Sequence, residues 1–92
     1  MISNDQNIKA LIKLIECIVK EVNFSEAELS ESIFTKSDFS KSIFAHTNLT
    51  KCDFRQAFDY EIDFNFNNIK KAKFSLPEAS TLLKSLEIIL EE

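Results

Sequence analysis

Few side chains in this sequence could carry out chemistry. His46 is the single histidine, and no cysteine lies beside it at the spacing of a metal site. Cys17 and Cys52 lie in segments of different kinds, so we expect two reduced thiols and no disulfide. Nothing around Cys52 indicates a lowered pKa, as an activated nucleophile would need. We therefore expect no enzymatic activity, no metal and no cofactor.

Two groups of charged residues are dense enough to consider as sites. Asp59, Glu61 and Asp63 could hold a cation or act as general acid and base, but neither a glycine turn nor a regular ligand spacing accompanies them. The three lysines within residues 70–73 could contact nucleic acid, although we interpret them as a solvated face. Direct nucleic-acid binding is not expected.

The composition limits the classes of protein that remain. Ninety-two residues with 45% hydrophobic content and a net charge of −4 make one small domain, residues 1–92. The chain has no glycine and one proline, which excludes glycine-loop phosphate sites, and its nine phenylalanines argue against disorder. No stretch is long and apolar enough to span a membrane, and the N-terminus lacks the layout of a signal peptide. We expect a cytoplasmic protein.

A period of five residues dominates the middle of the chain. Written in blocks of five from Val22, the sequence has a large apolar residue at the third place in ten of eleven blocks. The first place is mostly small, and the fourth and fifth are mostly polar. The third-place residues form the predicted core: Phe24, Leu29, Phe34, Phe39, Phe44, Leu49, Phe54, Phe64, Ile69 and Phe74.

This period fits neither a helix nor a flat strand. Every fifth residue is turned by about 140° on a helix and alternates faces on a strand, so the chain must change direction between blocks. If each block is one short side of a coil, the first and third places point inward. A small inward residue beside a large one then fills a narrow interior at close-packed density.

The blocks resemble the pentapeptide-repeat family, whose motif is a small residue, Asp or Asn, Leu or Phe, and two polar residues. The resemblance covers residues 22–76 and implies an all-β solenoid, a right-handed square β-helix of about 2.75 coils with four blocks per coil. Residues twenty apart should then stack in columns. Leu29, Leu49 and Ile69, the three apolar centres that are not phenylalanine, do fall in one such column.

Asp59 breaks the pattern, because it stands where an apolar centre belongs. A buried, unpaired carboxylate would be very costly. We expect this side of the coil to bulge or slip, so that Asp59 turns outward and Phe58 or Tyr60 fills the interior. A kink that faces a partner is the alternative.

The N-terminal flank is predicted to be a capping helix. Residues 4–20 place Ile8, Leu11, Ile12, Ile15, Ile18 and Val19 on one helical stripe, which we expect to cover the first coil. The alternative is a helix that binds another chain, with Leu14, off the stripe, facing the partner.

The C-terminal segment, residues 77–92, is predicted to form a short helix over 78–86 and a tail. Pro77 suits the first turn of a helix. The segment resembles the C-terminus of topoisomerase-protecting pentapeptide-repeat proteins, which pairs two subunits, and this resemblance implies a homodimer; a cap folded on its own shaft is the alternative. The expected interface residues are Leu82, Leu83, Leu86, Ile88, Ile89 and Leu90.

We expect a non-enzymatic scaffold that acts through protein binding or self-association, with Phe58, Tyr60 and Phe66 as a possible partner surface. The family resemblance also implies an alternative, imitation of duplex DNA to protect a type II topoisomerase such as DNA gyrase from quinolones. Residues 22–76 hold eight acidic and seven basic residues, a net charge of only −1. Duplex DNA carries one charge per about 1.7 Å, so this near-neutral shaft argues against mimicry.

Overall fold

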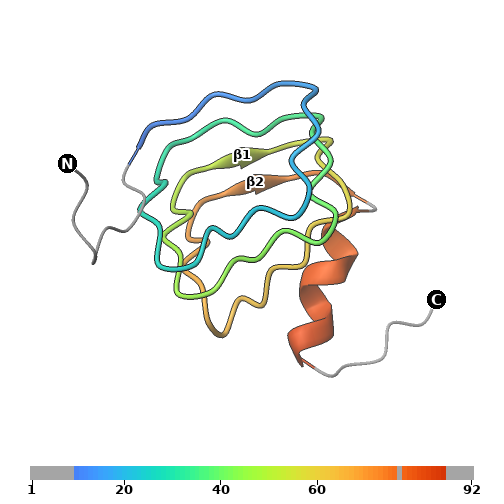
Figure 1. Ribbon diagram of the computed structural model, residues 1–92. Helices are drawn as coiled ribbons and strands as arrows, with labels where there is room; N and C mark the ends of the chain where they lie inside the picture. Colours follow the sequence, from blue (N-terminus) through green and yellow to red (C-terminus); the bar gives the residue numbers. More distant parts are fainter. Residues whose placement is uncertain (1–9, 77, 87–92) are drawn as a thin grey trace.

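The computed structural model describes residues 10–76 and 78–86, except for the side chains of residues 83–86. Residues 10–76 wind into a stack of coils, and residues twenty apart pair in parallel. Lys13 pairs with Ile33 and Ile33 with Asp53, where strand β1 (Asp53–Phe54) then pairs with strand β2 (Lys73–Phe74). Figure 1 shows β1 and β2 one above the other.

Each coil has four sides, which we name A to D in chain order. The chain passes side A four times and each other side three times, so thirteen sides follow one another in place of the eleven expected from Val22. The residues are 12–16, 32–36, 52–56 and 72–76 on side A; 17–21, 37–41 and 57–59 on side B; 22–26, 42–46 and 60–66 on side C; and 27–31, 47–51 and 67–71 on side D.

The corners between sides are tight turns. The third-place carbonyl accepts a hydrogen bond from the first N–H of the next block, as from Ser32 to Leu29 (3.0 Å) and from Cys52 to Leu49 (3.1 Å). The fifth place has positive φ, which is the signature of a type II turn. Such turns favour glycine, yet this chain uses charged and polar residues there: Glu16, Glu21, Glu26, Glu31, Lys36, Lys41, His46, Lys51, Gln56 and Lys71.

Second-place Asp and Asn residues stabilise the same turns. The side-chain oxygen accepts a hydrogen bond from the N–H two residues later, as in Asn23 to Ser25 (2.9 Å) and Asn48 to Thr50 (3.0 Å). This Asx arrangement gives a physical reason for the motif's preference at the second place.

First-place hydroxyls join one coil to the next. The Ser42 hydroxyl accepts a hydrogen bond from the Val22 N–H (3.1 Å) and donates one to the Val19 carbonyl (2.6 Å). Thr47 donates to the Phe24 carbonyl in the same way (2.8 Å), and the Cys52 thiol donates to the Leu29 carbonyl (3.0 Å). The small inward residues therefore fill space and satisfy backbone groups at the same time.

Third-place side chains form the core. Phe24 stacks on Phe44 with ring centroids 5.1 Å apart, and Phe54 stacks on Phe74 at 5.3 Å. Of the third-place residues predicted from Val22 onward, those that are buried are Phe24, Leu29, Phe34, Phe39, Phe44, Leu49 and Phe54, while Ile69 and Phe74 are partly buried against them.

The predicted N-terminal helix is wrong for residues 10–20, which form sides A and B of the first coil. Leu14 donates a backbone hydrogen bond to Ile33 (2.8 Å) and Val19 donates one to Asp38 (2.7 Å). The five-residue frame runs back through both segments and turns Leu14 and Val19 inward, so Leu14 does not face a partner.

The apolar stripe that suggested a helix arose by coincidence, since its members Leu11, Ile15 and Ile18 are exposed. Backbone pairing to the second coil satisfies groups that an isolated helix would have to satisfy alone.

The C-terminal helix has the predicted bounds. It is η1, a 3-10 helix of nine residues, Glu78–Leu86, which is long for this type of helix. η1 leaves the last coil and lies beside the stack (Figure 1), where Leu82 packs against the core. The side chains of Leu83 and Leu86, and the whole of Ile88, Ile89 and Leu90, lie outside the described residues. In the described part of the chain, no helix is long and apolar enough to cross a membrane.

Candidate functional site: the irregular side C and its groove

Side B is two residues shorter in the third coil than in the second. Phe58 pairs with Asp38, twenty residues away, but Ile62 pairs with Phe44, only eighteen away. The third coil therefore has no counterpart of Phe39 and Ser40. The corner moves with the shortening, because Asp59 takes the positive φ (56°) that the fifth place has elsewhere.

Tyr60 fills the space that the shortening leaves. It aligns with the small Ser42 of the coil above, yet its ring packs against Phe54 at 5.9 Å and Phe74 at 5.6 Å, and only 2% of it is exposed. Asp59 turns outward and accepts a hydrogen bond from the Ser40 hydroxyl (3.3 Å). Of the two residues expected to replace Asp59 inside, Tyr60 does so, while Phe58 stays exposed. The prediction that Tyr60 presents an exposed aromatic ring to a partner is therefore wrong.

Two extra residues on side C restore the register. The segment Asp63–Asn67 closes a loop through bonds to the Asp63 carbonyl from the Phe66 N–H (3.1 Å) and the Asn67 amide (2.8 Å). Asn67 also accepts from the Thr47 N–H (3.0 Å), twenty residues away, so the regular pairing resumes. Phe64 is displaced by this shift and is only half-buried, and Ile62 takes the place below Phe44. The prediction that Phe64 is a buried core residue is therefore wrong.

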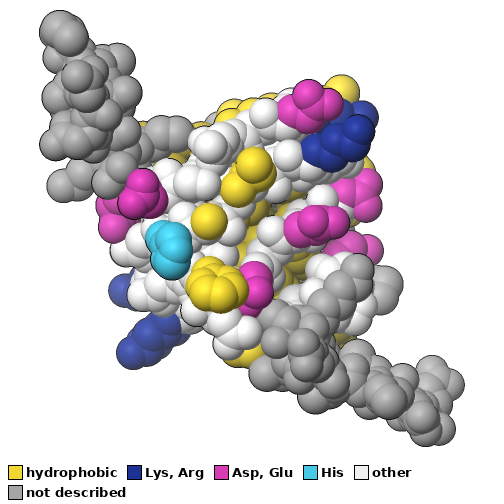
Figure 2. All heavy atoms as spheres, turned by 60° about the horizontal axis from the view of Figure 1, so that its bottom comes forward, with side chains coloured by type: hydrophobic (Ala, Val, Ile, Leu, Met, Phe, Trp, Pro, Cys, Tyr) yellow, Lys and Arg dark blue, Asp and Glu magenta, His cyan; other side chains and the backbone are white. Residues whose placement is uncertain are grey.

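The loop presents an aromatic ring to solvent. Phe66 is 57% exposed, and its ring meets the His46 ring edge to face with centroids 6.0 Å apart. Ile43, at a second place of the same side, is 52% exposed. The sequence signal for Ile43 was its replacement of the Asp or Asn that the motif prefers. Figure 2 shows the histidine among exposed hydrophobic and acidic side chains.

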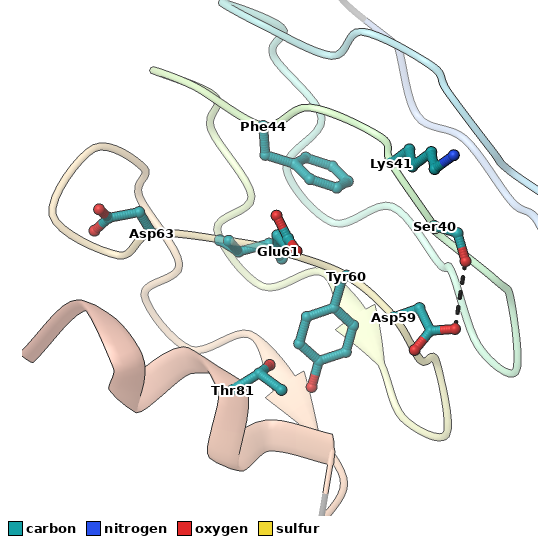
Figure 3. Close-up of a pocket in the computed structure, with 9 residues that line it drawn as sticks. Ser40, Lys41, Phe44, Asp59, Tyr60, Glu61, Asp63 and Thr81 are labelled. Atoms are coloured by element: carbon teal, nitrogen blue, oxygen red, sulfur yellow. Dashed lines mark hydrogen bonds between the residues drawn. The ribbon is translucent and has the colours of Figure 1, made fainter. Parts of the chain in front are cut away.

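A groove of about 760 Å³ lies along the shortened corner. Its buried wall consists of Phe44, Tyr60 and Ile62. Its outer residues are Ser40, Lys41, Asp59, Glu61, Asp63 and Thr81, the last from η1 (Figure 3). The groove exists because two residues are missing from side B and η1 closes only one end of the gap.

The charges of the shaft are separated by face, although they nearly cancel in total. A side is counted here together with the positive-φ corner residue at each of its ends. Counted in this way, side C carries five acidic residues and one lysine, a net charge of −4: Glu21, Glu26, Asp59, Glu61, Asp63 and Lys41. Side A with its corners lies on the opposite face and carries six basic and three acidic residues, a net charge of +3: Lys13, Lys36, Lys51, Arg55, Lys71, Lys73, Glu16, Glu31 and Asp53.

The Tyr60 hydroxyl is the notable polar atom at the groove wall. It is buried and has no hydrogen-bond partner among the described residues. Burial, together with the negative charge of Glu78, raises the pKa of Tyr60 to about 12. Figure 3 shows the hydroxyl directed toward Thr81 at the η1 end of the groove. An unsatisfied buried hydroxyl costs about 1–3 kcal/mol, so a donor that reached it would be favourable.

Comparison with known proteins identifies the repeat. A family model described as pentapeptide repeats matches residues 13–57 with eight copies. Residues 13–57 of this chain are therefore pentapeptide repeats. The matched region starts at Lys13, within the segment for which a helix was expected, and so supports the coil observed there.

Among solved structures, one similar to this pentapeptide-repeat chain is a trypsin-treated variant of QnrB1, described as a plasmid-mediated fluoroquinolone resistance protein. The two are 24% identical with a TM-score of 0.44, and the match covers 87% of this chain and 40% of that one. The chain thus spans well under half the length of the QnrB1 structure. Curated protein sequences gave no match.

The remaining residues that could react or bind a metal in this pentapeptide-repeat chain do not form a common site. Burial raises the pKa of the Cys52 thiol to about 11, which keeps it protonated and unreactive at neutral pH. His46 is exposed, and Cys17 is half-buried with its thiol 3.4 Å from the Ile15 carbonyl. Over residues 10–76 and η1, no three His, Cys, Asp or Glu side chains are placed to hold a metal ion. Asp59, Glu61 and Asp63 share the groove without forming such a cluster.

Proposed function

We propose that this protein is a non-enzymatic scaffold that binds a protein partner through side C. The observation that carries the proposal is the exposure of Ile43 and Phe66 on side C, the acidic side whose residues also line the groove. Apolar side chains that gather on one face mark an interaction surface more often than scattered ones do. The interior is filled by stacked rings, so the surface is where a ligand would bind.

Affinity capture from native lysate tests this proposal. Wild type is compared with a double variant, Ile43→Asn and Phe66→Ser, and with a control, Ile18→Asn, on side B. We expect a captured protein that wild type and the control retain and the double variant loses. Identical captured sets from all three proteins would contradict binding through side C.

A second candidate function is occupation of the DNA site of a type II topoisomerase. The net charge of −4 on side C favours it, because a single DNA strand carries one charge per about 3.4 Å, comparable to the spacing over three stacked coils. The opposing positive charge of side A restricts any such mimicry to one face. A gyrase supercoiling assay with and without quinolone is the test, and inertness at micromolar protein would remove the candidate.

We also propose that the protein self-associates through its C-terminal segment and works in the cytoplasm. Leu82, Leu83, Leu86, Ile88, Ile89 and Leu90 would supply the apolar contacts of a homodimer. The two free cysteines support a reducing compartment. Light scattering after size exclusion should give a dimer for wild type and half that mass for Leu86→Asp. An unchanged mass for the folded variant would rule out this interface.

A further inference from the structure

We infer that the side C groove binds an arginine-bearing, extended segment of a partner protein, with a guanidinium group held between the groove carboxylates and the Tyr60 hydroxyl. This inference rests on the proposed function and names the chemistry of the partner. It combines three independent features of the groove: its charge, its unsatisfied acceptor and its apolar neighbours.

The charge of the groove selects a cation. Asp59, Glu61 and Asp63 line it, and Lys41 offsets one of these three charges. Asp59 is only weakly engaged, through the 3.3 Å bond from Ser40, so its carboxylate keeps acceptor capacity for a ligand. An anionic partner would meet repulsion here.

The Tyr60 hydroxyl selects a cation that can donate several hydrogen bonds. Carboxylates on the outer edge and a phenolic oxygen on the inner wall require donors that point in different directions. A guanidinium group offers five N–H donors in a rigid plane, whereas an ammonium group is a more strongly hydrated point charge. Thr81, which bonds to the Glu78 carbonyl within its own helix (3.1 Å), is the residue toward which the hydroxyl points. Because the hydroxyl is buried, Thr81 has to move aside before a guanidinium N–H can reach the phenol oxygen.

The apolar neighbours of the groove indicate that the cation belongs to a peptide. Ile43 and Phe66 are exposed on the same side, and neither has a polar group that a small cation could use. Apolar residues beside the arginine in the partner would cover them. A free polyamine or a metal ion would leave both exposed, so those ligands fit only part of the surface.

The test measures fluorescence anisotropy of full-length protein with a labelled peptide in which arginine alternates with leucine and valine. Matched peptides replace arginine by lysine or by the neutral isostere citrulline. We expect the citrulline peptide to bind at least about tenfold more weakly than the arginine peptide, since charged hydrogen bonds are lost. The lysine peptide should bind several-fold more weakly, and spermidine should compete poorly.

Protein variants assign the binding to the groove. Glu61→Gln should weaken binding of the arginine peptide about tenfold, and Glu31→Gln, an exposed corner residue outside side C, should leave it unchanged. Tyr60→Phe gives a second readout, because it removes the unsatisfied hydroxyl. It should raise the urea midpoint of the free protein and yet weaken the peptide several-fold, a pair of changes that a purely structural role for Tyr60 would not produce.

Three results would overturn the inference: equal affinity for arginine and citrulline peptides, equal effects of Glu61→Gln and Glu31→Gln, or no binding to wild type. These failures are distinguishable from failure of the proposed function. If the lysate capture still depends on Ile43 and Phe66 while the arginine peptide fails, the surface stands and the assigned partner chemistry is wrong.

Discussion

Single residues in this protein accept unfavourable backbone conformations that other chains assign to glycine. Lys51 has φ of 59° at its corner, and its N–H donates to the Lys70 carbonyl (2.9 Å). A left-handed conformation costs an L-residue about 1–2 kcal/mol. The corner is retained because the stacked coils fix it on both sides. Long polar side chains there stay in solvent and keep the faces charged.

Substitutions at Lys51 should report this conformational cost. Lys51→Val should lower the free energy of unfolding by about 1–2 kcal/mol relative to Lys51→Asn, because a β-branched side chain clashes at positive φ and asparagine tolerates it. Urea denaturation of the two variants is the measurement. Equal stabilities would show that the corner does not constrain the residue in solution.

The Cys52 thiol should make the protein sensitive to alkali. Its pKa of about 11 in the fold lies above the ordinary thiol value, so between about pH 9 and 11 the unfolded thiol releases its proton first and stability falls as pH rises. We expect wild type to lose about 1–2 kcal/mol more than Cys52→Ser over this interval. Serine is the matched change, because Ser32 occupies the same place one coil earlier. Parallel stability curves for both proteins would contradict the shift.

At the scale of the coil sides, the first-place hydroxyls are the link between neighbouring coils. Ser42 bonds to the Val22 N–H and the Val19 carbonyl, and both partners belong to the coil above. The hydroxyl therefore prevents two unsatisfied backbone groups in an apolar interior. An alanine at the same place would fill a similar volume without satisfying either group.

Ser42→Ala should lower the free energy of unfolding by about 2–3 kcal/mol, because it leaves a buried donor and a buried acceptor unpaired. Ser42→Thr should stay within about 1 kcal/mol, since the Thr47 hydroxyl donates the equivalent hydrogen bond to the Phe24 carbonyl on side D. Thermal or urea unfolding of both variants measures the two changes in stability. A stable alanine variant would mean that water replaces the hydroxyl.

The sequence was most informative where the five-residue frame was unbroken. The stacked columns and the inward first places follow from it, and the helix over 78–86 follows from Pro77 at the point where the frame ends. The first coil was missed because Ile12 and Val19 satisfy a helical stripe and the repeat frame at once, and no local preference separates the two. The groove was missed because the sequence shows only that Asp59 breaks the repeat. It does not show that side B loses two residues and that side C gains two. The large Asn67 at a first place was the visible sign of that compensation.

At the scale of the whole molecule, the near-neutral total charge concealed two oppositely charged faces. The count over residues 22–76 suggested a shaft with little electrostatic character. Folding assigns residues to sides by their position in the twenty-residue coil, so the acids gather on side C and most of the bases on side A. Long-range steering of a partner therefore depends on this arrangement, and salt should weaken it.

The last coil depends on η1 for its cover. Leu82 packs against the core from η1, whereas Leu76, just before the helix, is 83% exposed. Leu82→Ala should lower the free energy of unfolding by about 1–2 kcal/mol, roughly half the cost for a fully buried leucine. Leu76→Ala is the matched control and should be neutral. Equal effects in urea titration would show that η1 does not protect this end.

The twenty-residue coil also determines how such a chain can change in length. Inserting one complete coil between sides would raise η1 by one strand spacing, about 4.8 Å, and leave it facing the same direction. Inserting a single block would turn η1 and everything after it by a quarter of a circle. Insertion of five residues therefore changes the direction in which the C-terminal end points, whereas insertion of twenty residues changes only its distance from the first coil.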